Sequence, residues 1–230
     1  MGVPFNIKKL WSDKAIAINK LLPFKIMEYN QIYKTNNVWG TQPNKLLYKI
    51  YSKGENNDYF LDLGCGQGRD ALFMLKNGYK VTAVDNSEKG IDKIKEYIKK
   101  NNLFKNKIDI HCDDIRNFDI EDNKYSIINF YNSLQFLPKK DALILIAKAK
   151  KLLKIKGHII ISSFLVDDPT YTKQINRNRC FFKSKELKNI FSDFTIIFYK
   201  ELIIEDKAHI GYPEPHKHSV VKLIAQKISN

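Results

Sequence analysis

The sequence predicts an α/β fold in which a mostly parallel β-sheet carries helices on both faces. From residue 58 onwards, β-rich apolar runs alternate with amphipathic helical stretches. Some of these runs, such as residues 157–165, are almost continuously apolar, which is typical of strands buried on both faces. The chain then closes with two β-rich runs, residues 194–204 and 219–228, without a helix between them. Such a pair predicts an antiparallel hairpin.

The first 50 of the 230 residues carry apolar side chains at helical spacing and show no strand alternation. The pattern is broken at Pro23 and again across residues 36–44, which contain glycine, proline and several asparagines. We therefore expect residues 1–50 to form a cap, or lid, of short amphipathic helices. Residues 51–230 should form one larger domain, since a chain of this length fits a single domain with an appendage.

The alternating part predicts its elements in order. Residues 59–63 (YFLDL) predict the first strand, and the helix after it is stopped by Gly78. Ser87 should cap the second helix, because its hydroxyl can accept a backbone N–H at the helix start. Strands are predicted at residues 59–63, 80–85, 107–112, 124–131 and 157–165, and helices at residues 69–77, 87–102, 139–154 and 184–191.

The net charge of +14 comes from lysines spread along the whole chain, without a basic block or an aromatic RNA-reading motif. Nucleic acid therefore stays an open but disfavoured partner. No apolar run approaches the roughly 20 residues of a membrane helix, and no signal-peptide pattern opens the sequence. We therefore expect a cytoplasmic protein without a membrane partner. The three cysteines, Cys65, Cys112 and Cys180, are widely spaced and predict neither a disulfide framework nor a metal site.

The segment GCGQG, residues 64–68, follows the first predicted strand directly. Parallel sheets bind ligands at this strand-to-helix turn, and glycines let backbone N–H groups approach the ligand closely. The register Gly66, Gly68, Ala71 also satisfies a loose dinucleotide motif, so the glycines alone leave two cofactors open. Asp62 separates the two, because a carboxylate repels a pyrophosphate and attracts a sulfonium or an ammonium group. We therefore expect a cationic ligand beside Asp62.

S-adenosylmethionine meets this expectation, since it combines a sulfonium, an ammonium, a ribose diol and an adenine. Asp85 ends the second strand, where its carboxylate can accept hydrogen bonds from both ribose hydroxyls. Asp114 follows the third strand and can accept from the adenine amino group, while the N–H of Ile115 reaches a ring nitrogen. Asn86 and Ser87 should lie on one face of the adenine ring and Ile115 on the other. Two roles stay open for Arg69, which can pair with the cofactor carboxylate or with neighbouring acids.

The run LDLGCGQGRDALFMLKNGYKVTAVDNSEKGI resembles the cofactor-binding half of class I S-adenosylmethionine-dependent methyltransferases, and within them the TehB (tellurite-resistance) group. FFKSKELKNIF, before the last strands, extends the resemblance, which runs loosely from about residue 55 to the C-terminus. It implies a Rossmann-like fold with a seven-stranded, mostly parallel sheet whose last strand is antiparallel. It also implies that the methionine end of the cofactor is held by Asp62, Gly64, Gly66 and Gly68, the ribose by Asp85 and the adenine by Asp114. To this cofactor site we add Cys65 and Tyr131.

Two regions outside the cofactor turn offer side chains for the methyl acceptor. The cap contributes Tyr33 and Trp39 as candidate substrate contacts. The loop after the fourth strand contributes Asn132 and Gln135 as candidate catalytic residues. Methyltransferases of the resembled kind often have a histidine in this loop, and Gln135 takes its place here.

The tail segment AHIGYPEPHKH carries three of the five histidines. His216 and His218 lie on the same side of an extended strand, so metal binding, substrate contact and no role all stay open. We interpret His216 and His218 as substrate contacts and predict no metal site. The resemblance to the TehB group places an active-site histidine near His209, which we therefore take as a catalytic candidate.

We interpret the protein as an enzyme that transfers a methyl group from S-adenosylmethionine to a small molecule, such as a thiol, a selenol or a chalcogen oxyanion. The reaction is an in-line displacement at an activated carbon, so alignment and exclusion of water can supply most of the catalysis. The basic composition favours an anionic acceptor. Two alternatives stay open, namely methylation of RNA or protein and a non-catalytic module that only binds the cofactor.

Overall fold

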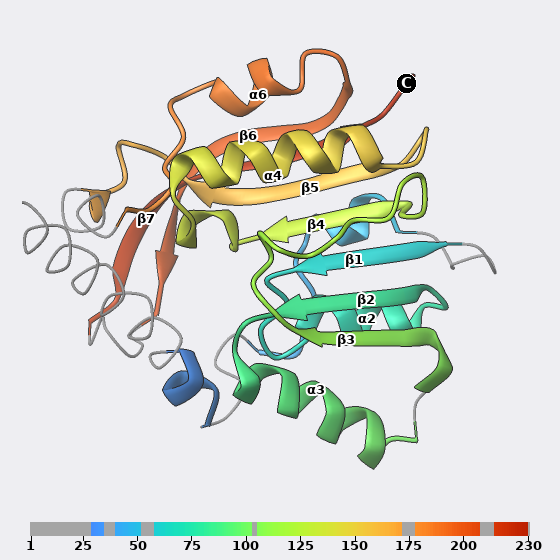
Figure 1. Cartoon of the computed structure of the whole chain (residues 1–230). Coiled ribbons are helices and arrows are strands. Elements are labelled where there is room, and N and C mark those ends of the chain that lie inside the picture. Colours follow the sequence, from blue (N-terminus) through green and yellow to red (C-terminus); the bar gives the residue numbers. More distant parts are fainter. Residues whose placement is uncertain are drawn as a thin grey trace, which may run out of the picture.

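The computed structural model describes residues 29–34, 40–51, 58–102, 105–171, 178–207 and 214–229. Within them, seven strands form one sheet in the order β3-β2-β1-β4-β5-β7-β6 (Figure 1). The strands are β1 (Tyr59–Leu63), β2 (Lys80–Asp85), β3 (Ile108–Cys112), β4 (Ile127–Tyr131), β5 (His158–Phe164), β6 (Thr195–Asp206) and β7 (His216–Gln226). The helices are η1 (Leu47–Lys49), α2 (Arg69–Lys76), α3 (Glu88–Lys100), η2 (Lys105–Lys107), η3 (Leu134–Phe136), α4 (Lys139–Leu152) and α6 (Glu186–Ile190).

Strand directions confirm the predicted topology. The pairs β1 with β2, β2 with β3, β1 with β4 and β4 with β5 are all parallel. The last strand, β7, is antiparallel to both of its neighbours, β5 and β6. It lies between them, so the sheet is completed by the final strand of the chain.

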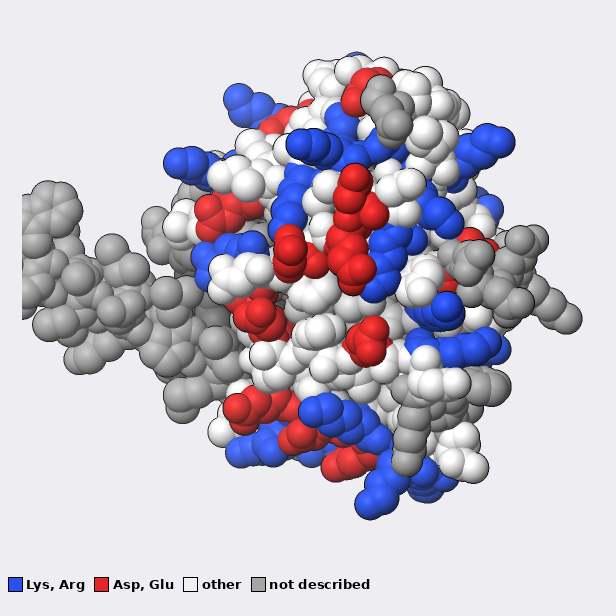
Figure 2. Space-filling view, turned by 45° about the vertical axis from the view of Figure 1, so that its right-hand side comes forward, with Lys and Arg blue, Asp and Glu red and all other residues white. Residues whose placement is uncertain are grey.

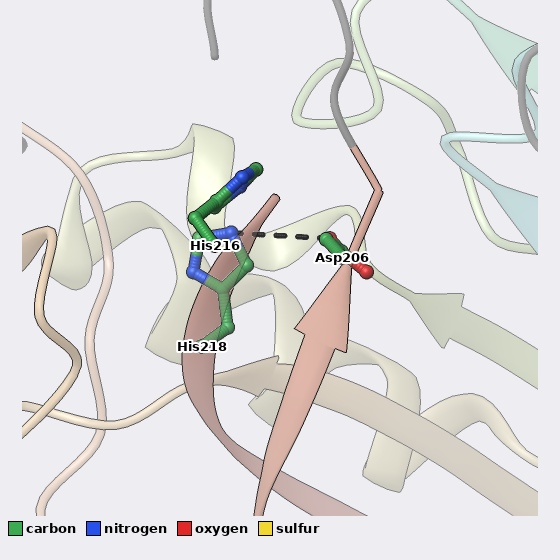
Figure 3. Close-up of side chains that lie close together, drawn as sticks. All are labelled: Asp206, His216 and His218. Carbon is green, nitrogen blue, oxygen red and sulfur yellow. Dashed lines mark ion pairs between the residues drawn. The ribbon is translucent and has the colours of Figure 1, made fainter. Parts of the chain in front are cut away.

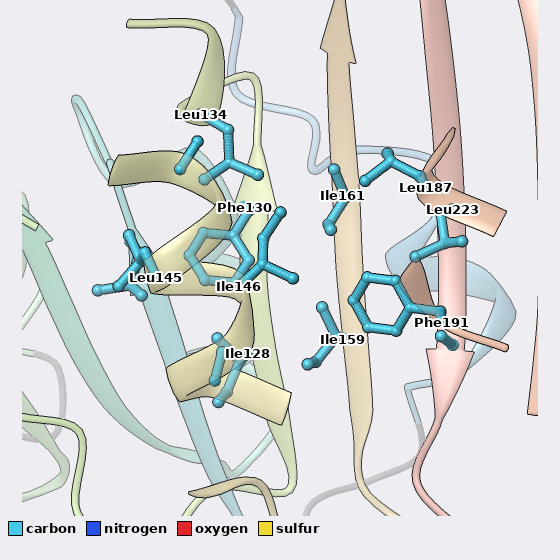
Figure 4. Packing of buried hydrophobic residues seen from close by; sticks show 14 of the residues in the cluster. Ile128, Phe130, Leu134, Leu145, Ile146, Ile159, Ile161, Leu187, Phe191 and Leu223 are labelled. Atoms are coloured by element: carbon cyan, nitrogen blue, oxygen red, sulfur yellow. The ribbon is translucent and has the colours of Figure 1, made fainter. Parts of the chain in front are cut away.

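Helices cover both faces of the sheet, as predicted. Along β5, Ile159 packs into the cluster that includes Ile146 of α4 (Figure 4). The next residue, Ile160, belongs to the cluster of Met74 in α2. This alternation follows from the strand geometry, in which successive side chains point to opposite faces. Full burial of each such side chain contributes about 1.5–3 kcal/mol. The two clusters hold the carboxyl ends of the strands at fixed positions.

The hairpin differs from its prediction at one end. Residues 205–218 were expected as a turn-rich connection, but β6 continues to Asp206 and β7 begins at His216. Asp206 is paired with His216 in the ladder. Backbone hydrogen bonds extend the ladder here without apolar side chains, so the hydropathy pattern underestimated its length.

The described surface agrees with the charge pattern of the sequence. Basic and acidic side chains are interspersed over the face that Figure 2 shows. On that face, the positive charge is spread and does not form one continuous patch. None of the described helices is long and apolar enough to cross a membrane.

Candidate active site

The glycine turn, residues 64–68, connects β1 to α2 at the carboxyl edge of the sheet. Gly64, Gly66 and Gly68 have φ angles of 85°, 53° and 80°, which side chains rarely adopt. A Cβ on Gly64 would lie 2.4 Å from the Cβ of Ser133, and one on Gly66 would lie 2.6 Å from the hydroxyl of Tyr33. Glycine is therefore required by backbone conformation and by close neighbours from two other parts of the chain.

Asp85, at the end of β2, holds the glycine turn in place. Its two carboxylate oxygens accept backbone hydrogen bonds from Gly66 and Ser87, both at 2.8 Å. Burial raises the pKa of Asp85, and these two hydrogen bonds act in the opposite direction. A carboxylate offers about four acceptor positions, so two remain for the ribose hydroxyls that the sequence analysis assigned to it.

Asp62, at the end of β1, is a buried carboxylate with an incomplete set of partners. Its Oδ1 accepts a hydrogen bond from Nδ2 of Asn129 at 2.8 Å. Its Oδ2 is buried and has no hydrogen-bond partner among the described residues. Burial, followed by the nearby Asp70 carboxylate, raises the pKa of Asp62 to about 8. An ammonium group would supply the missing donor and stabilise the ionised form, so the site fits the predicted cationic ligand.

Buried polar atoms without a described partner gather at the carboxyl ends of β1 and β4. Asp62 and Asn129 are paired in the ladder between these strands, and Ser133 packs on Gly64. The atoms are Oδ2 of Asp62, Oδ1 of Asn129, Oγ of Ser133 and Oε1 of Gln135. Because buried polar atoms nearly always have a hydrogen-bond partner, this group of atoms indicates where a polar ligand would supply the missing hydrogen bonds. Gln135 was predicted from the sequence as a site residue, whereas Asn129 and Ser133 were not.

A polar network behind the glycine turn was also missed. Asp70 of α2 is buried and accepts hydrogen bonds from the backbone N–H of Asn44 at 2.8 Å and from its side-chain amide at 2.6 Å. Nδ2 of Asn129 lies 3.2 Å from the same carboxylate. Nε of Arg69 donates to Asp70 at 3.2 Å. In this structure Arg69 therefore pairs with a neighbouring acid, which is the second of the two roles predicted for it.

The predicted adenine residues follow β2 and β3, which are neighbours in the sheet. Asp114 is half-buried, and Nε of Arg116 lies 3.0 Å from both of its carboxylate oxygens. Burial raises the pKa of Asp114, but the hydrogen bonds from Arg116 outweigh this effect and lower it. Ile115 is buried and Asn86 is exposed. Arg116 fixes the orientation of Asp114, and the adenine contact itself stays a prediction.

Residues 29–34 form a helical segment, here called the cap segment, that contacts the cofactor side of the sheet. Oδ1 of Asn30 accepts hydrogen bonds from Oγ of Ser87 at 2.7 Å and from the N–H of Lys89 at 3.1 Å. The ring of Tyr29 packs edge-on against Phe136, with centroids 5.1 Å apart. The cap segment therefore joins the start of α3 to the loop after β4.

Of the two substrate contacts predicted in the cap, the structure describes one. Tyr33 is buried, and its hydroxyl approaches Gly66, so it lies beside the cofactor turn. Trp39 lies outside the described residues, as does the predicted catalytic residue His209. The boundary between cap and main domain at residues 50 and 51 stays a prediction.

Three further predicted residues surround the turn. Cys65 is buried, and burial raises the pKa of its thiol. Tyr131 is half-buried at the end of β4, and the guanidinium of Arg69 lies 5.5 Å from its ring centroid. Asn132 is exposed, and its side-chain oxygen accepts a hydrogen bond from Oγ of Ser162 at 2.7 Å. The last contact ties the loop after β4 to β5.

His216 and His218 come together with Asp206 at the end of the hairpin (Figure 3). His218 is buried and stacks on Phe164, with ring centroids 4.4 Å apart. Its Nδ1 lies 2.9 Å from Oδ2 of Asp168. The two histidines were predicted as substrate contacts, and the structure brings them to the edge of the sheet where β5 ends.

Comparison with known proteins decides the family. The family model described as "Tellurite resistance protein TehB" matches residues 50–209, which is more than half of the chain. The chain belongs to the TehB family. The match covers the glycine turn and the strand ends that carry the predicted cofactor residues. It confirms the resemblance to class I S-adenosylmethionine-dependent methyltransferases, and with it S-adenosylmethionine as the cofactor.

Curated relatives and solved structures agree with this TehB assignment. A carboxy-S-adenosyl-L-methionine synthase from Pasteurella multocida is 34% identical over 112 residues, which are 46% of this chain and 44% of the relative. The chain thus spans less than half the length of that relative. The crystal structure of TehB from Haemophilus influenzae is 27% identical, with a TM-score of 0.63 over 75% of this chain and 58% of that one. A methyltransferase from Methanosarcina mazei, 17% identical with a TM-score of 0.64 over 82% of this chain and all of that one, shows the shared fold.

Proposed function

We propose that this TehB-family protein transfers a methyl group from S-adenosylmethionine to a small anionic acceptor, such as a thiol, a selenol or a chalcogen oxyanion. One observation carries the proposal. The buried Oδ2 of Asp62 has no partner among the described residues, and Asp62 lies near the end of β1, two residues before the glycine turn. A cationic donor beside Asp62 would stabilise the ionised form of this carboxyl, whose pKa is raised to about 8, whereas a dinucleotide pyrophosphate would repel the ionised form.

The residues at the strand ends can hold the cofactor in one extended position. Asp62 would bind the ammonium group, Asp85 the ribose hydroxyls and Asp114 the adenine amino group. When bound, S-adenosylmethionine would supply a sulfonium-activated methyl group. An acceptor lone pair would attack its carbon as the carbon–sulfur bond breaks, and S-adenosylhomocysteine would be the leaving group. Gln135, whose buried Oε1 has no described partner, would orient the acceptor. Such alignment is the main requirement, because the carbon is already activated.

The choice of acceptor rests on two supporting points. The description of the family names tellurite resistance, which supports a chalcogen oxyanion or its reduced forms. The chain carries a net charge of +14, which concentrates anions near the protein. Basic side chains in Figure 2 are interspersed with acidic ones, which favours a small anion over an extended nucleic acid.

A second candidate reaction follows from the relatives. The relatives from Pasteurella multocida and Shewanella loihica are named carboxy-S-adenosyl-L-methionine synthases, with 34% and 35% identity. In such a reaction the cofactor would be the product scaffold and no S-adenosylhomocysteine would be released. The two candidates therefore differ in what happens to the cofactor.

Product analysis separates these reactions. The full-length protein is incubated with S-adenosylmethionine and a panel of tellurite, selenite, thiols and selenols. Parallel reactions contain small carboxylic acids as carboxyl donors, or RNA or protein, and every mixture is analysed by mass spectrometry. Release of S-adenosylhomocysteine together with a methylated acceptor supports the proposal. A carboxylated cofactor supports the second candidate. Cofactor binding without any turnover, or methylation of added RNA or protein alone, would overturn the proposal.

A further inference from the structure

We propose that Asp206, His216 and His218 bind a divalent first-row transition-metal ion at the end of the β6–β7 hairpin where the chain passes from β6 to β7. One ligand atom from each side chain lies within 4.8 Å of the others. In Figure 3 the His218 ring and the Asp206 carboxylate face each other, with His216 beside them. Both histidines lie beyond residue 209, where the family match ends. The inference does not depend on the proposed methyl transfer.

Strand register explains why these three side chains meet. Asp206 and His216 are paired across the β6–β7 ladder, and His218 lies two residues further along β7. Residues at positions i and i+2 of a strand point to the same face, and side chains of paired residues stand side by side. The ladder therefore places two imidazoles and one carboxylate on one face without any loop to position them.

Asp168 provides the outer partner that metal-binding histidines usually have. Its Oδ2 lies 2.9 Å from Nδ1 of His218 and also accepts the backbone N–H of Ser219 at 2.9 Å. Thr170 donates its backbone N–H to the other carboxylate oxygen at 2.8 Å. Because a carboxylate only accepts, the proton of a neutral His218 ring lies on Nδ1 and the lone pair on Nε2. A carboxylate behind a histidine in this way fixes the ring and strengthens it as a ligand.

The ligand geometry matches a zinc-like ion better than magnesium or calcium. Nε2 of His218 lies 3.9 Å from Oδ2 of Asp206. In a tetrahedral site with bonds of about 2.1 Å, ligand atoms lie about 3.4 Å apart, so a small side-chain movement closes the site. Two imidazoles favour zinc, cobalt, nickel or iron, whereas magnesium and calcium prefer oxygen ligands. Three protein ligands leave at least one position open.

A metal-free alternative makes a different prediction. A protonated His218 could form an ion pair with Asp168 and Asp206, as the distances of 2.9 Å and 3.9 Å allow. In that arrangement His216 would only contact the His218 ring edge-on, with centroids 4.7 Å apart, and would not be a ligand. Metal binding requires His216 and Asp206 as well as His218, so variants at His216 and Asp206 distinguish the two explanations.

The test uses full-length, tag-free protein that has been stripped with a chelator and dialysed. Zn²⁺ is titrated by calorimetry, and Co²⁺ is titrated by visible absorption, which reports coordination directly. We expect one equivalent of either ion. His216→Ala and Asp206→Ala should weaken binding by more than about tenfold, and Asp168→Asn by about 10- to 100-fold, the usual cost of losing such an outer partner. His111→Ala, which removes an exposed histidine from β3, is the matched control and should bind as the wild type does.

Folding and cofactor binding are measured on every variant. Circular dichroism and S-adenosylmethionine affinity should stay unchanged in His216→Ala, whose side chain is only half-buried. Absence of stoichiometric binding in the wild type would overturn the metal site, as would equal affinities of wild type and His216→Ala. Either result would leave the proposed methyl transfer unaffected, because that is tested by cofactor binding and product analysis.

Discussion

The side-chain amide of Asn129 lies 2.8 Å from Oδ1 of Asp62 and also 3.2 Å from the Asp70 carboxylate. One NH₂ group thus bridges two buried carboxylates at the base of the glycine turn. Burial and the repulsion from Asp70 raise the pKa of Asp62 to about 8, against 3.8 for an ordinary carboxyl. At neutral pH the cofactor-free site therefore holds a proton that a bound ammonium group would displace.

The first prediction is proton release on cofactor binding. At pH 7, S-adenosylmethionine should release close to one proton from the wild type and none from Asp62→Asn. The variant should also bind the cofactor at least about tenfold more weakly, since a hydrogen bond to a charged group contributes about 1.5–3 kcal/mol. Calorimetry in two buffers of different ionisation enthalpy measures both quantities.

Asp109→Asn is the matched control, because Asp109 is exposed on β3. It should leave the affinity and the proton release unchanged. Equal proton release from the wild type and Asp62→Asn would show that another group titrates. Unchanged affinity in Asp62→Asn would remove this carboxylate from the cofactor site.

The second prediction concerns stability without cofactor. Between about pH 4 and pH 8 the folded protein keeps a proton on Asp62 that the unfolded chain has lost, because the pKa is about 8 in the fold and 3.8 otherwise. The unfolded state then binds fewer protons, so this carboxyl makes the free energy of unfolding fall as pH rises through that window. Urea unfolding at several pH values should show a shallower decline for Asp62→Asn. Parallel curves for the two proteins would contradict the shifted pKa.

The predicted parts of the cofactor site follow from a simple topological rule. Asp62 is the last residue but one of β1, Asp85 ends β2 and Asp114 follows β3, so the carboxyl ends of parallel strands bring them to one edge. Their positions could therefore be predicted from strand order alone. Their hydrogen-bond partners could not, because each partner is fixed by tertiary packing and carries no periodic signal.

Asn44 and Asp206 make two contacts that the local sequence pattern does not predict. Asn44 reaches Asp70 across 26 residues of sequence from a segment that resembles an ordinary proline-containing loop. Asp206 meets His216 because of a ladder register that polar residues do not reveal. Local patterns predict elements and their order, whereas these contacts depend on where two elements meet.

The third prediction tests the missed network. Asn44→Ala removes the hydrogen bond that the side-chain amide donates to Asp70, whereas the backbone N–H of residue 44 can still donate to that carboxylate. It also removes the side-chain oxygen that accepts the backbone N–H groups of Leu46 and Leu47. A buried carboxylate that loses a donor costs about 1–3 kcal/mol, so the free energy of unfolding should fall by this amount. Chemical denaturation measures it. The exposed neighbour Gln42 supplies the control, Gln42→Ala, which should change stability by less than about 0.5 kcal/mol. A similar small effect for Asn44→Ala would mean that water replaces the lost donor.

The fourth prediction addresses the cap segment. Asn30→Ala removes the acceptor for Ser87 and Lys89 at the start of α3, while Oγ of Ser87 still caps the helix by accepting the N–H of Gly90. Two such hydrogen bonds contribute about 1–3 kcal/mol together, so the cap segment should open more often. Because Tyr33 in the same segment covers Gly66, S-adenosylmethionine should dissociate several-fold faster, with little change in melting temperature.

Stopped-flow displacement measures the dissociation rate of the cofactor. The control is Gln31→Ala, at an exposed position of the cap segment, which should leave this rate unchanged. Equal dissociation rates for wild type and Asn30→Ala would show that the cap segment does not retain the cofactor.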